Sequence, residues 1–172
     1  AALLAIGPWA VLSHERAARK LSIETRKGYR VQVSIPHANR SGALEGVRIW
    51  RSRDLLPDDI TRRGLFRVTR VGRTIVDLAS VLDDEWLRAT LDSAIRQRGS
   101  NLYWVRRAHN QHARGRDGAR RLAALLARYQ GPEDAGASVL ESFAMDLGLA
   151  TGRKPIWHYS ISDGGSFNVE VD

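Results

Sequence analysis

The sequence contains no cysteine. This absence excludes disulfide bonds, zinc sites built from thiolates and a cysteine nucleophile. A chain without cysteine is compatible with a reducing compartment, so the sequence predicts a cytoplasmic protein. Several common site motifs are missing too: there is no glycine-rich phosphate loop, no G-x-S-x-G elbow and no H-E-x-x-H helix.

Long apolar runs are also missing. No stretch of about 18 apolar residues occurs, so the sequence predicts no membrane span. No basic segment precedes the apolar residues 1–5, so no signal peptide is visible. The first residue is alanine and not methionine, which suggests a processed, trimmed or fragmentary chain. With 172 residues, 43% of them hydrophobic, the chain is long enough for one large domain or two small ones.

Lysine is scarce, whereas arginine is abundant: of 27 basic residues, 24 are arginine and 3 are lysine. The formal net charge is +8. Such a balance favours polyanionic partners, nucleic acid above all, so DNA is the expected partner. The same composition also follows from a GC-rich genome, which leaves a second interpretation of the arginines open.

Six segments carry the pattern of helices. Ser13 and Thr69 are placed to cap two of them, and three acidic residues open another at its positive end. Gly7 and Pro8 end the first helix. The expected helices are residues 1–6, 14–21, 69–82, 83–98, 101–112 and 122–129.

Alternating apolar and polar residues predict three strands in the first half of the chain, at 29–35, 47–50 and 65–68. The polar segment 54–63 is expected to be a loop. The alternation predicts a small antiparallel sheet with one buried face.

The last part of the chain differs from the rest. Gly, Pro and acidic residues at 131–137 predict a linker between a region 1–130 and a region 138–172. A helix is expected at 138–147, followed by two strands at 156–161 and 166–171 with a turn between them. The fold class is therefore α+β: a small sheet with helices, an arginine-rich helical middle, and a helix plus β-hairpin at the end.

Two acids in this last region suggest a metal site. Asp172 follows the final expected strand, and Glu141 lies on the preceding helix. A hard divalent cation needs oxygen ligands held by rigid elements, so magnesium or manganese is the possible cofactor, and no organic cofactor is expected. The alternative is ordinary: the polar face of an edge strand often carries such residues in water.

The arginine-rich middle has the opposite charge. Guanidinium groups match phosphate oxygens, so these arginines are the candidate nucleic-acid contacts, although a solvated helix face would look the same. His109 and His112 have a spacing that can bind metal, but no third ligand is evident. The candidate arginines are Arg106, Arg107, Arg114, Arg116, Arg120, Arg121 and Arg128.

Arg73 and Asp77 lie four residues apart on an expected helix. Arginine ahead of aspartate is the less favourable order for a helical ion pair. We therefore expect each to have a partner elsewhere, in a buried hydrogen-bond network.

Three segments resemble bacterial AbiEi-type antitoxin and regulator-like proteins: residues 11–18 (VLSHERAA), 50–55 (WRSRDL) and 68–79 (VTRVGRTIVDLA). The run Arg73-Thr74-x-x-Asp77-Leu78 is the most specific of these. Ser138 to Glu141, with the strand that ends at Asp172, is similar to the opening of a Vsr-like endonuclease domain of the PD-(D/E)xK, restriction-endonuclease-like superfamily. Relatives usually begin with a winged helix-turn-helix and continue past the position of Asp172, so both ends are expected to be truncated.

This resemblance implies a bacterial, DNA-associated fragment of a metal-dependent endonuclease. Asp172 would match the first catalytic aspartate and Glu141 the helix glutamate, with both as metal ligands. The ion would lower the pKa of a bound water and stabilise the developing charge. This chain by itself is expected to be inactive. Two alternatives stay open: a non-catalytic antitoxin-like regulator that binds DNA, and a domain that binds an acidic protein partner or toxin.

Overall fold

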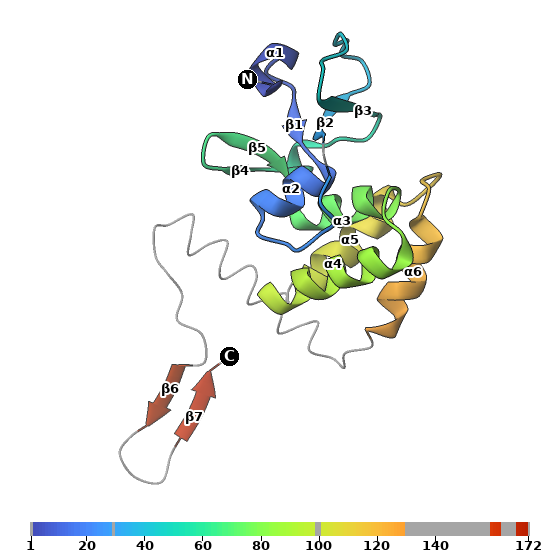
Figure 1. Cartoon of the computed structure of the whole chain (residues 1–172). Helices are drawn as coiled ribbons and strands as arrows, with labels where there is room; N and C mark the ends of the chain where they lie inside the picture. The colour runs from blue at the N-terminus through green and yellow to red at the C-terminus, as the bar shows by residue number, and fades with distance from the viewer. Residues whose placement is uncertain (1, 29, 99–100, 130–158, 163–167, 172) are drawn as a thin grey trace. The chain divides into compact units, whose positions relative to one another are not determined.

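The computed structural model describes residues 2–28, 30–98, 101–129, 159–162 and 168–171 (Figure 1). The chain divides into two compact units, Ala1–Gln130 and Gly131–Asp172. Within the described part of the chain, no helix has the length and apolar character needed to cross a membrane.

The first unit contains a five-stranded sheet in the order β3-β2-β1-β5-β4. The strands are β1 (Val11–Leu12), β2 (Val31–Pro36), β3 (Val47–Ser52), β4 (Ile60–Arg63) and β5 (Phe66–Thr69).

The sheet is mixed, so the prediction of an antiparallel sheet was wrong. β1 pairs antiparallel with β2 and parallel with β5, while β2 and β3 are parallel and β4 and β5 antiparallel. Two strands were missed. β1 has only two residues, too few to show alternation, and β4 lies in the segment 54–63 that was expected to be a loop. The chain direction of a pair depends on its connection, which local alternation does not report.

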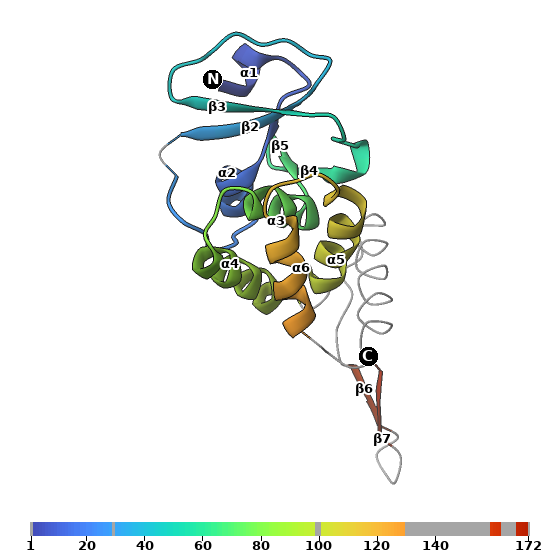
Figure 2. The ribbon, with the colours of Figure 1, turned by 90° about the vertical axis from the view of Figure 1, so that its right-hand side faces the viewer.

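The helices lie largely where their period predicted them. They are α1 (Ala2–Ile6), α2 (His14–Lys20), α3 (Val71–Ala79), α4 (Asp84–Gln97), α5 (Asn101–His112) and α6 (Ala119–Arg128), with a short 3-10 turn at Pro57–Asp59. Figures 1 and 2 show α3 to α6 gathered at one end of the unit, and α1 with β2 and β3 at the other.

The two predicted caps, Ser13 and Thr69, meet different outcomes. Ser13 occupies the N-cap position of α2, although its side chain makes no capping hydrogen bond. Asp83 caps α4, because its carboxylate accepts a hydrogen bond from the Trp86 amide. Thr69 is not the cap of α3. Its hydroxyl lies 2.7 Å from the Thr74 hydroxyl, and Arg70 occupies the capping position.

Two apolar clusters form the core of this unit. One lies between α3, α4, α5 and α6, around Ile75, Leu78, Leu91 and Leu122. The other packs α1 against the sheet. All residues of α3 after Val71 are buried. This helix therefore stands at the centre of the helical layer, and its polar residues must find partners inside the protein.

The second unit contains β6 (Tyr159–Ser162) and β7 (Asn168–Val171), which pair antiparallel. Ile161 lies opposite Val169. The two expected strands are confirmed in type and order. The expected linker 131–137 and helix 138–147 lie outside the described residues.

Candidate functional site

The most highly organised polar group in the first unit surrounds Arg73 on α3. Its side chain is only 1% exposed, and all three of its nitrogens donate hydrogen bonds. Nε donates to Asp77 Oδ1 at 2.9 Å, and Nη1 donates to Asp59 Oδ2 at 3.0 Å. Nη1 also donates to the Asp54 carbonyl at 2.9 Å, and Nη2 to the Ser52 hydroxyl at 2.8 Å. The network predicted around Arg73 and Asp77 is therefore confirmed.

His112 and Arg116 complete this group, which we call the Arg73 cluster (Ser52, Asp54, Asp59, Arg73, Asp77, His112 and Arg116). His112 ends α5 and lies between two carboxylates, with Nδ1 3.0 Å from Asp54 and Nε2 2.8 Å from Asp59. Arg116 follows α5 and donates to Asp54 at 2.6 Å and to Asp77 at 3.0 Å. The cluster thus ties the segment after β3, the turn before β4, α3 and the end of α5 together.

The charged side chains of the Arg73 cluster can lie in the interior because the carboxylates are paired with cations and hydrogen-bond donors. Burial alone would raise the pKa of Asp54, but the Ser52 hydrogen bond, Arg73 and Arg116 outweigh it and hold that pKa well below its usual value. The pKa of Asp59 is lowered in the same way: against burial act a His112 hydrogen bond, the Leu56 amide and Arg73. Paired, hydrogen-bonded charges are the form in which buried ions persist.

The Arg73 cluster has the geometry of a structural network that holds segments of the fold together. Its three carboxylates are engaged by Arg73, Arg116 and His112. Only one buried oxygen of the cluster, Asp77 Oδ2, lacks a hydrogen-bond partner among the described residues. In the part of the chain that the structure describes, no group of three His, Asp or Glu side chains could hold a metal ion.

His14 is a buried polar residue of this unit that lies outside the Arg73 cluster. Its ring stacks on Trp50 at 4.4 Å between centroids, and its Nδ1 lies 2.9 Å from the Ser13 hydroxyl. Arg48 covers the same indole at 4.0 Å. Burial is the main cause that lowers the pKa of His14 to about 4, so the ring is neutral at physiological pH.

Three of the seven candidate arginines serve the fold. Arg106 donates to the carbonyls of Leu126 and Tyr129, at the C-terminal end of α6. Arg121 donates to the carbonyl of Ala79 at the end of α3 and to that of Leu82 beyond it, and it forms an exposed ion pair with Asp84. Arg116 belongs to the Arg73 cluster. Arginine at a helix C-terminus satisfies carbonyls that lack an intrahelical partner.

The other four candidates are exposed. Arg107 lies over the Trp104 ring at 5.5 Å, on the outside of α5. Arg114, Arg120 and Arg128 form no hydrogen bond or ion pair with another described residue. The exposed face of α6, defined by Arg120, Arg121, Ala123, Ala124, Ala127 and Arg128, contains only arginine and alanine.

The remaining candidates, Glu141 and Asp172, lie outside the described residues. His109 does not join His112: its Nε2 lies 3.0 Å from the Ala119 carbonyl, whereas His112 is held by carboxylates. Sequence reasoning missed Asp54, Asp59 and His112 as partners of Arg73, because they lie 14 to 39 residues away from it. The only local signal was the Arg73-Asp77 order.

Protein-family models were compared with this chain and none matches. A search of curated proteins finds no match either.

Proposed function

We propose that the first unit binds DNA through its exposed arginines on α5 and α6, without chemistry of its own. The exposed face of α6 carries the proposal. It presents Arg120 and Arg128 beside small alanines, and the helix itself contributes no acidic residue, so a polyanion can approach these two arginines closely. Neither guanidinium is engaged by another described residue, so both forks are free to bind phosphate oxygens.

The charge of the unit supports the same conclusion. Residues 1–130 contain 25 Lys and Arg against 12 Asp and Glu, a net charge of +13. Positive charge of this size attracts polyphosphates over a range set by the salt concentration. Recognition would be mainly of the phosphate backbone, because contacts of this kind position a protein on DNA without reading its sequence.

The test compares two double variants of the whole chain. Fluorescence anisotropy with a labelled duplex, at several salt concentrations, gives the affinity and its salt dependence. The variant Arg120→Gln/Arg128→Gln should bind more weakly, and its log–log salt slope should fall by about 2, because each lost phosphate contact removes roughly one counterion.

The matched control is Arg62→Gln/Arg63→Gln, which removes the same charge from the exposed end of β4. Binding to duplex DNA should fall much less in this control. If both variants lose affinity equally, the α6 face is not the contact surface. If neither wild type nor control binds DNA at moderate salt, an acidic protein partner becomes the better explanation of the charge.

A second candidate function concerns the last unit. The formation of β7 favours it, because this strand ends at Val171 and Asp172 follows directly, as a metal-binding restriction-endonuclease-like strand would require. Calorimetry with magnesium and manganese on the whole chain, and on Glu141→Ala, tests it. Binding that Glu141→Ala abolishes would support a metal site, whereas binding unchanged by the substitution would contradict it.

A further inference from the structure

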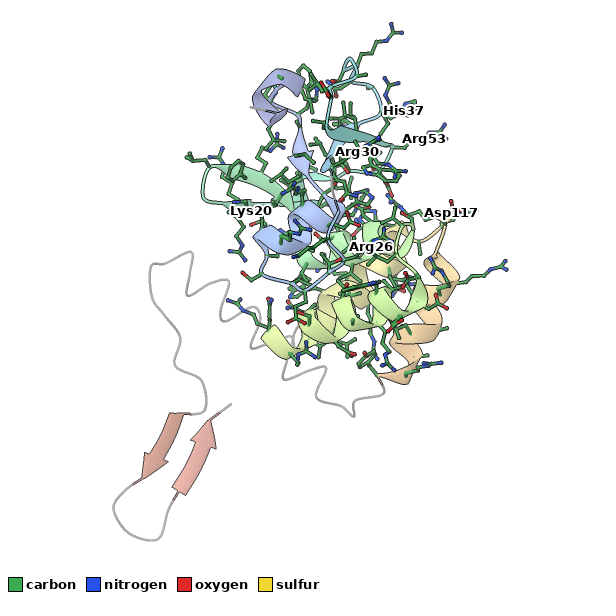
Figure 3. The ribbon with its side chains drawn as sticks, viewed as in Figure 1. Lys20, Arg26, Arg30, His37, Arg53 and Asp117 are labelled. Atoms are coloured by element: carbon green, nitrogen blue, oxygen red, sulfur yellow. The ribbon has the colours of Figure 1, made fainter. Side chains whose placement is uncertain are left out.

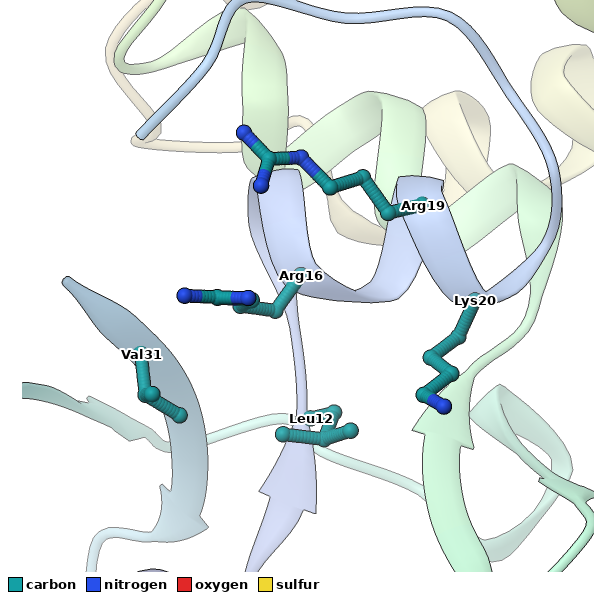
Figure 4. A pocket seen from close by; sticks show the side chains of 5 residues that line it. All are labelled: Leu12, Arg16, Arg19, Lys20 and Val31. Atoms are coloured by element: carbon teal, nitrogen blue, oxygen red, sulfur yellow. The ribbon is translucent and has the colours of Figure 1, made fainter. Parts of the chain in front are cut away.

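A pocket of about 340 Å³ lies between α2 and the strands beneath it (Figure 4). Leu12 of β1 and Val31 of β2 form its apolar floor, and Arg16, Arg19 and Lys20 of α2 form its rim. Figure 4 shows the Arg16 and Arg19 side chains extending in the same direction from the helix, with Lys20 on the other side of Leu12. The volume lies in the range of small-molecule sites, roughly 300–1,000 Å³.

The three cations of the rim lie within about one turn of a short helix. Arg16 is three residues from Arg19 and four from Lys20, so it neighbours both of them on the helix surface. Like charges at this spacing repel one another and destabilise a helix. A bound anion would remove this repulsion.

No carboxylate among the described residues neutralises this rim. Glu15 is the nearest acid on α2, but it is buried and pairs with Arg26 at 3.3 Å. Arg16 Nε is buried without a hydrogen-bond partner in the described part of the chain. Lys20 makes a cation–π contact with Phe66 at 4.4 Å, and no carboxylate of a described residue pairs with its ammonium group. Among the described residues, therefore, no acidic side chain compensates the positive charge of the pocket.

The floor limits which anion fits. Leu12 and Val31 offer no hydrogen bond from their side chains, so a small, fully hydrated anion would gain little from them. A phosphate bonded to a less polar group would place its oxygens at the guanidinium groups and its remaining part on the apolar floor. The half-exposed Phe66 ring, which contacts Lys20, adds a flat apolar surface next to that lysine.

We propose that this α2 pocket binds a phosphate ester of nucleotide type, with Arg16, Arg19 and Lys20 as the phosphate ligands. The phosphate can come from a free nucleotide or from a polynucleotide chain. The pocket is separate from the α5–α6 surface: Lys20 and Asp117, which lies between α5 and α6, stand on opposite sides of the unit in Figure 3. The proposal does not depend on DNA binding by α6.

The experiment uses the whole chain, with adenosine monophosphate, inorganic phosphate and a short labelled single-stranded oligonucleotide as probes. Calorimetry measures the first two and fluorescence anisotropy the third. The variant Arg19→Gln/Lys20→Gln removes two exposed cations of the rim and keeps the buried residues intact. The control Arg40→Gln/Arg53→Gln removes the same charge at exposed positions elsewhere. We expect the rim variant to bind at least tenfold more weakly than the control, because each lost charge-assisted hydrogen bond weakens binding by about that factor or more.

The probes separate the two sources of the phosphate. If adenosine monophosphate binds and the rim variant loses it, the pocket takes free nucleotides. If only the oligonucleotide distinguishes rim variant from control, the pocket takes a phosphate of a polynucleotide. If no probe distinguishes them, the proposal is overturned. If Arg120→Gln/Arg128→Gln bound DNA as tightly as the wild type, the proposal that α6 binds DNA would be wrong. The adenosine monophosphate result would be unaffected.

Discussion

Arg73 illustrates how one side chain can organise a protein interior. Its guanidinium joins Asp77 on its own helix to two more distant segments, one at Ser52 and Asp54 and one at Asp59, and each nitrogen has a defined acceptor. A planar fork with five N–H donors is required for this, and an ammonium group has only three donors that radiate from one point. The residue is therefore specified by geometry as well as by charge.

Substitution of Arg73 by lysine should destabilise the fold. Arg73→Lys keeps the positive charge, but it leaves Asp59, Asp77 or the Asp54 carbonyl without its donor. Breaking a buried ion pair on one side costs about 3 kcal/mol or more, so we expect a loss of that order in the free energy of unfolding. Urea denaturation measures it, with Arg53→Lys on the exposed surface as the control. Equal stability of the two variants would show that the cluster contributes only charge.

His14 should make stability depend on pH in a defined window. Its pKa falls from 6.5 to about 4 on folding, mainly through burial, so the unfolded chain binds the proton more tightly. The contribution is complete above pH 6.5 and is lost as pH falls toward about 4. The shift corresponds to roughly 3 kcal/mol. His14→Asn tolerates the left-handed backbone at this position and should flatten the profile in that window. Urea unfolding at several pH values measures this. If the free energies of unfolding of the wild type and of His14→Asn fell equally between pH 6.5 and 4, the prediction would be contradicted.

Asp54 and Asp59 act at lower pH. Their pKa values are depressed below 3.8 in the folded protein, so their contribution to stability is complete above that value. It is lost as pH falls toward the folded values. Acid unfolding of this protein should therefore have two phases of proton uptake, the first from His14 and the second from the Arg73 cluster.

At the scale of elements, the contact between α3 and α5 is unusually close. A Cβ on Gly72 would lie 2.3 Å from the Trp104 carbonyl oxygen and 2.9 Å from the Ala108 side chain. The backbone oxygen cannot move aside without moving α5. Glycine at this position therefore sets the distance between the two helices.

Gly72→Ala should destabilise the protein although alanine is the better helix former. The gain in helix propensity is about 1 kcal/mol, and it is outweighed by the forced separation of two packed helices. We expect a net loss of roughly 1–3 kcal/mol in thermal or urea unfolding. Gly42→Ala is the control, because nothing lies within 4 Å of a Cβ at that position. A Gly72 variant as stable as this control would contradict the packing argument.

The elements also show what a sequence can and cannot predict. Helices such as α5 repeat an apolar period over several turns, so their existence and bounds follow from local residues. β1 and β4 are short, and the parallel pairing of β2 with β3 is a property of distant segments. The same division holds in the site. The order of Arg73 and Asp77 in the sequence predicted a hydrogen-bond network. The participation of Asp59 and His112 could not be predicted, because the fold brings them to Arg73 from distant positions in the sequence.

At the scale of the whole molecule, charge is divided unevenly along the chain. Residues 1–130 have a net charge of +13, and residues 131–172 have 2 basic against 7 acidic residues, a net charge of −5. A polyanion that approaches the whole chain therefore meets a lower net charge than the first unit alone would present.

A chain that ends at Gln130 should bind duplex DNA more tightly than the whole chain. Removal of the acidic region raises the net charge from +8 to +13, which strengthens long-range attraction. The difference should be largest at low salt and should shrink as screening shortens the range of the field. Fluorescence anisotropy at matched salt concentrations measures it. Equal affinities at low salt would show that the acidic region does not affect DNA binding.

The shortest of the described strands stands at the centre of the five-stranded sheet. β1 contributes two residues and joins the β2–β3 pair to the β4–β5 pair. Few backbone hydrogen bonds therefore cross this seam, and the Arg73 cluster spans it from Ser52 at the end of β3 to Asp59 before β4. The ion pairs of the Arg73 cluster therefore help to hold the β2–β3 pair and the β4–β5 pair together. Acidity, which scarcely weakens an apolar core, therefore helps to determine whether the two halves of this sheet hold together.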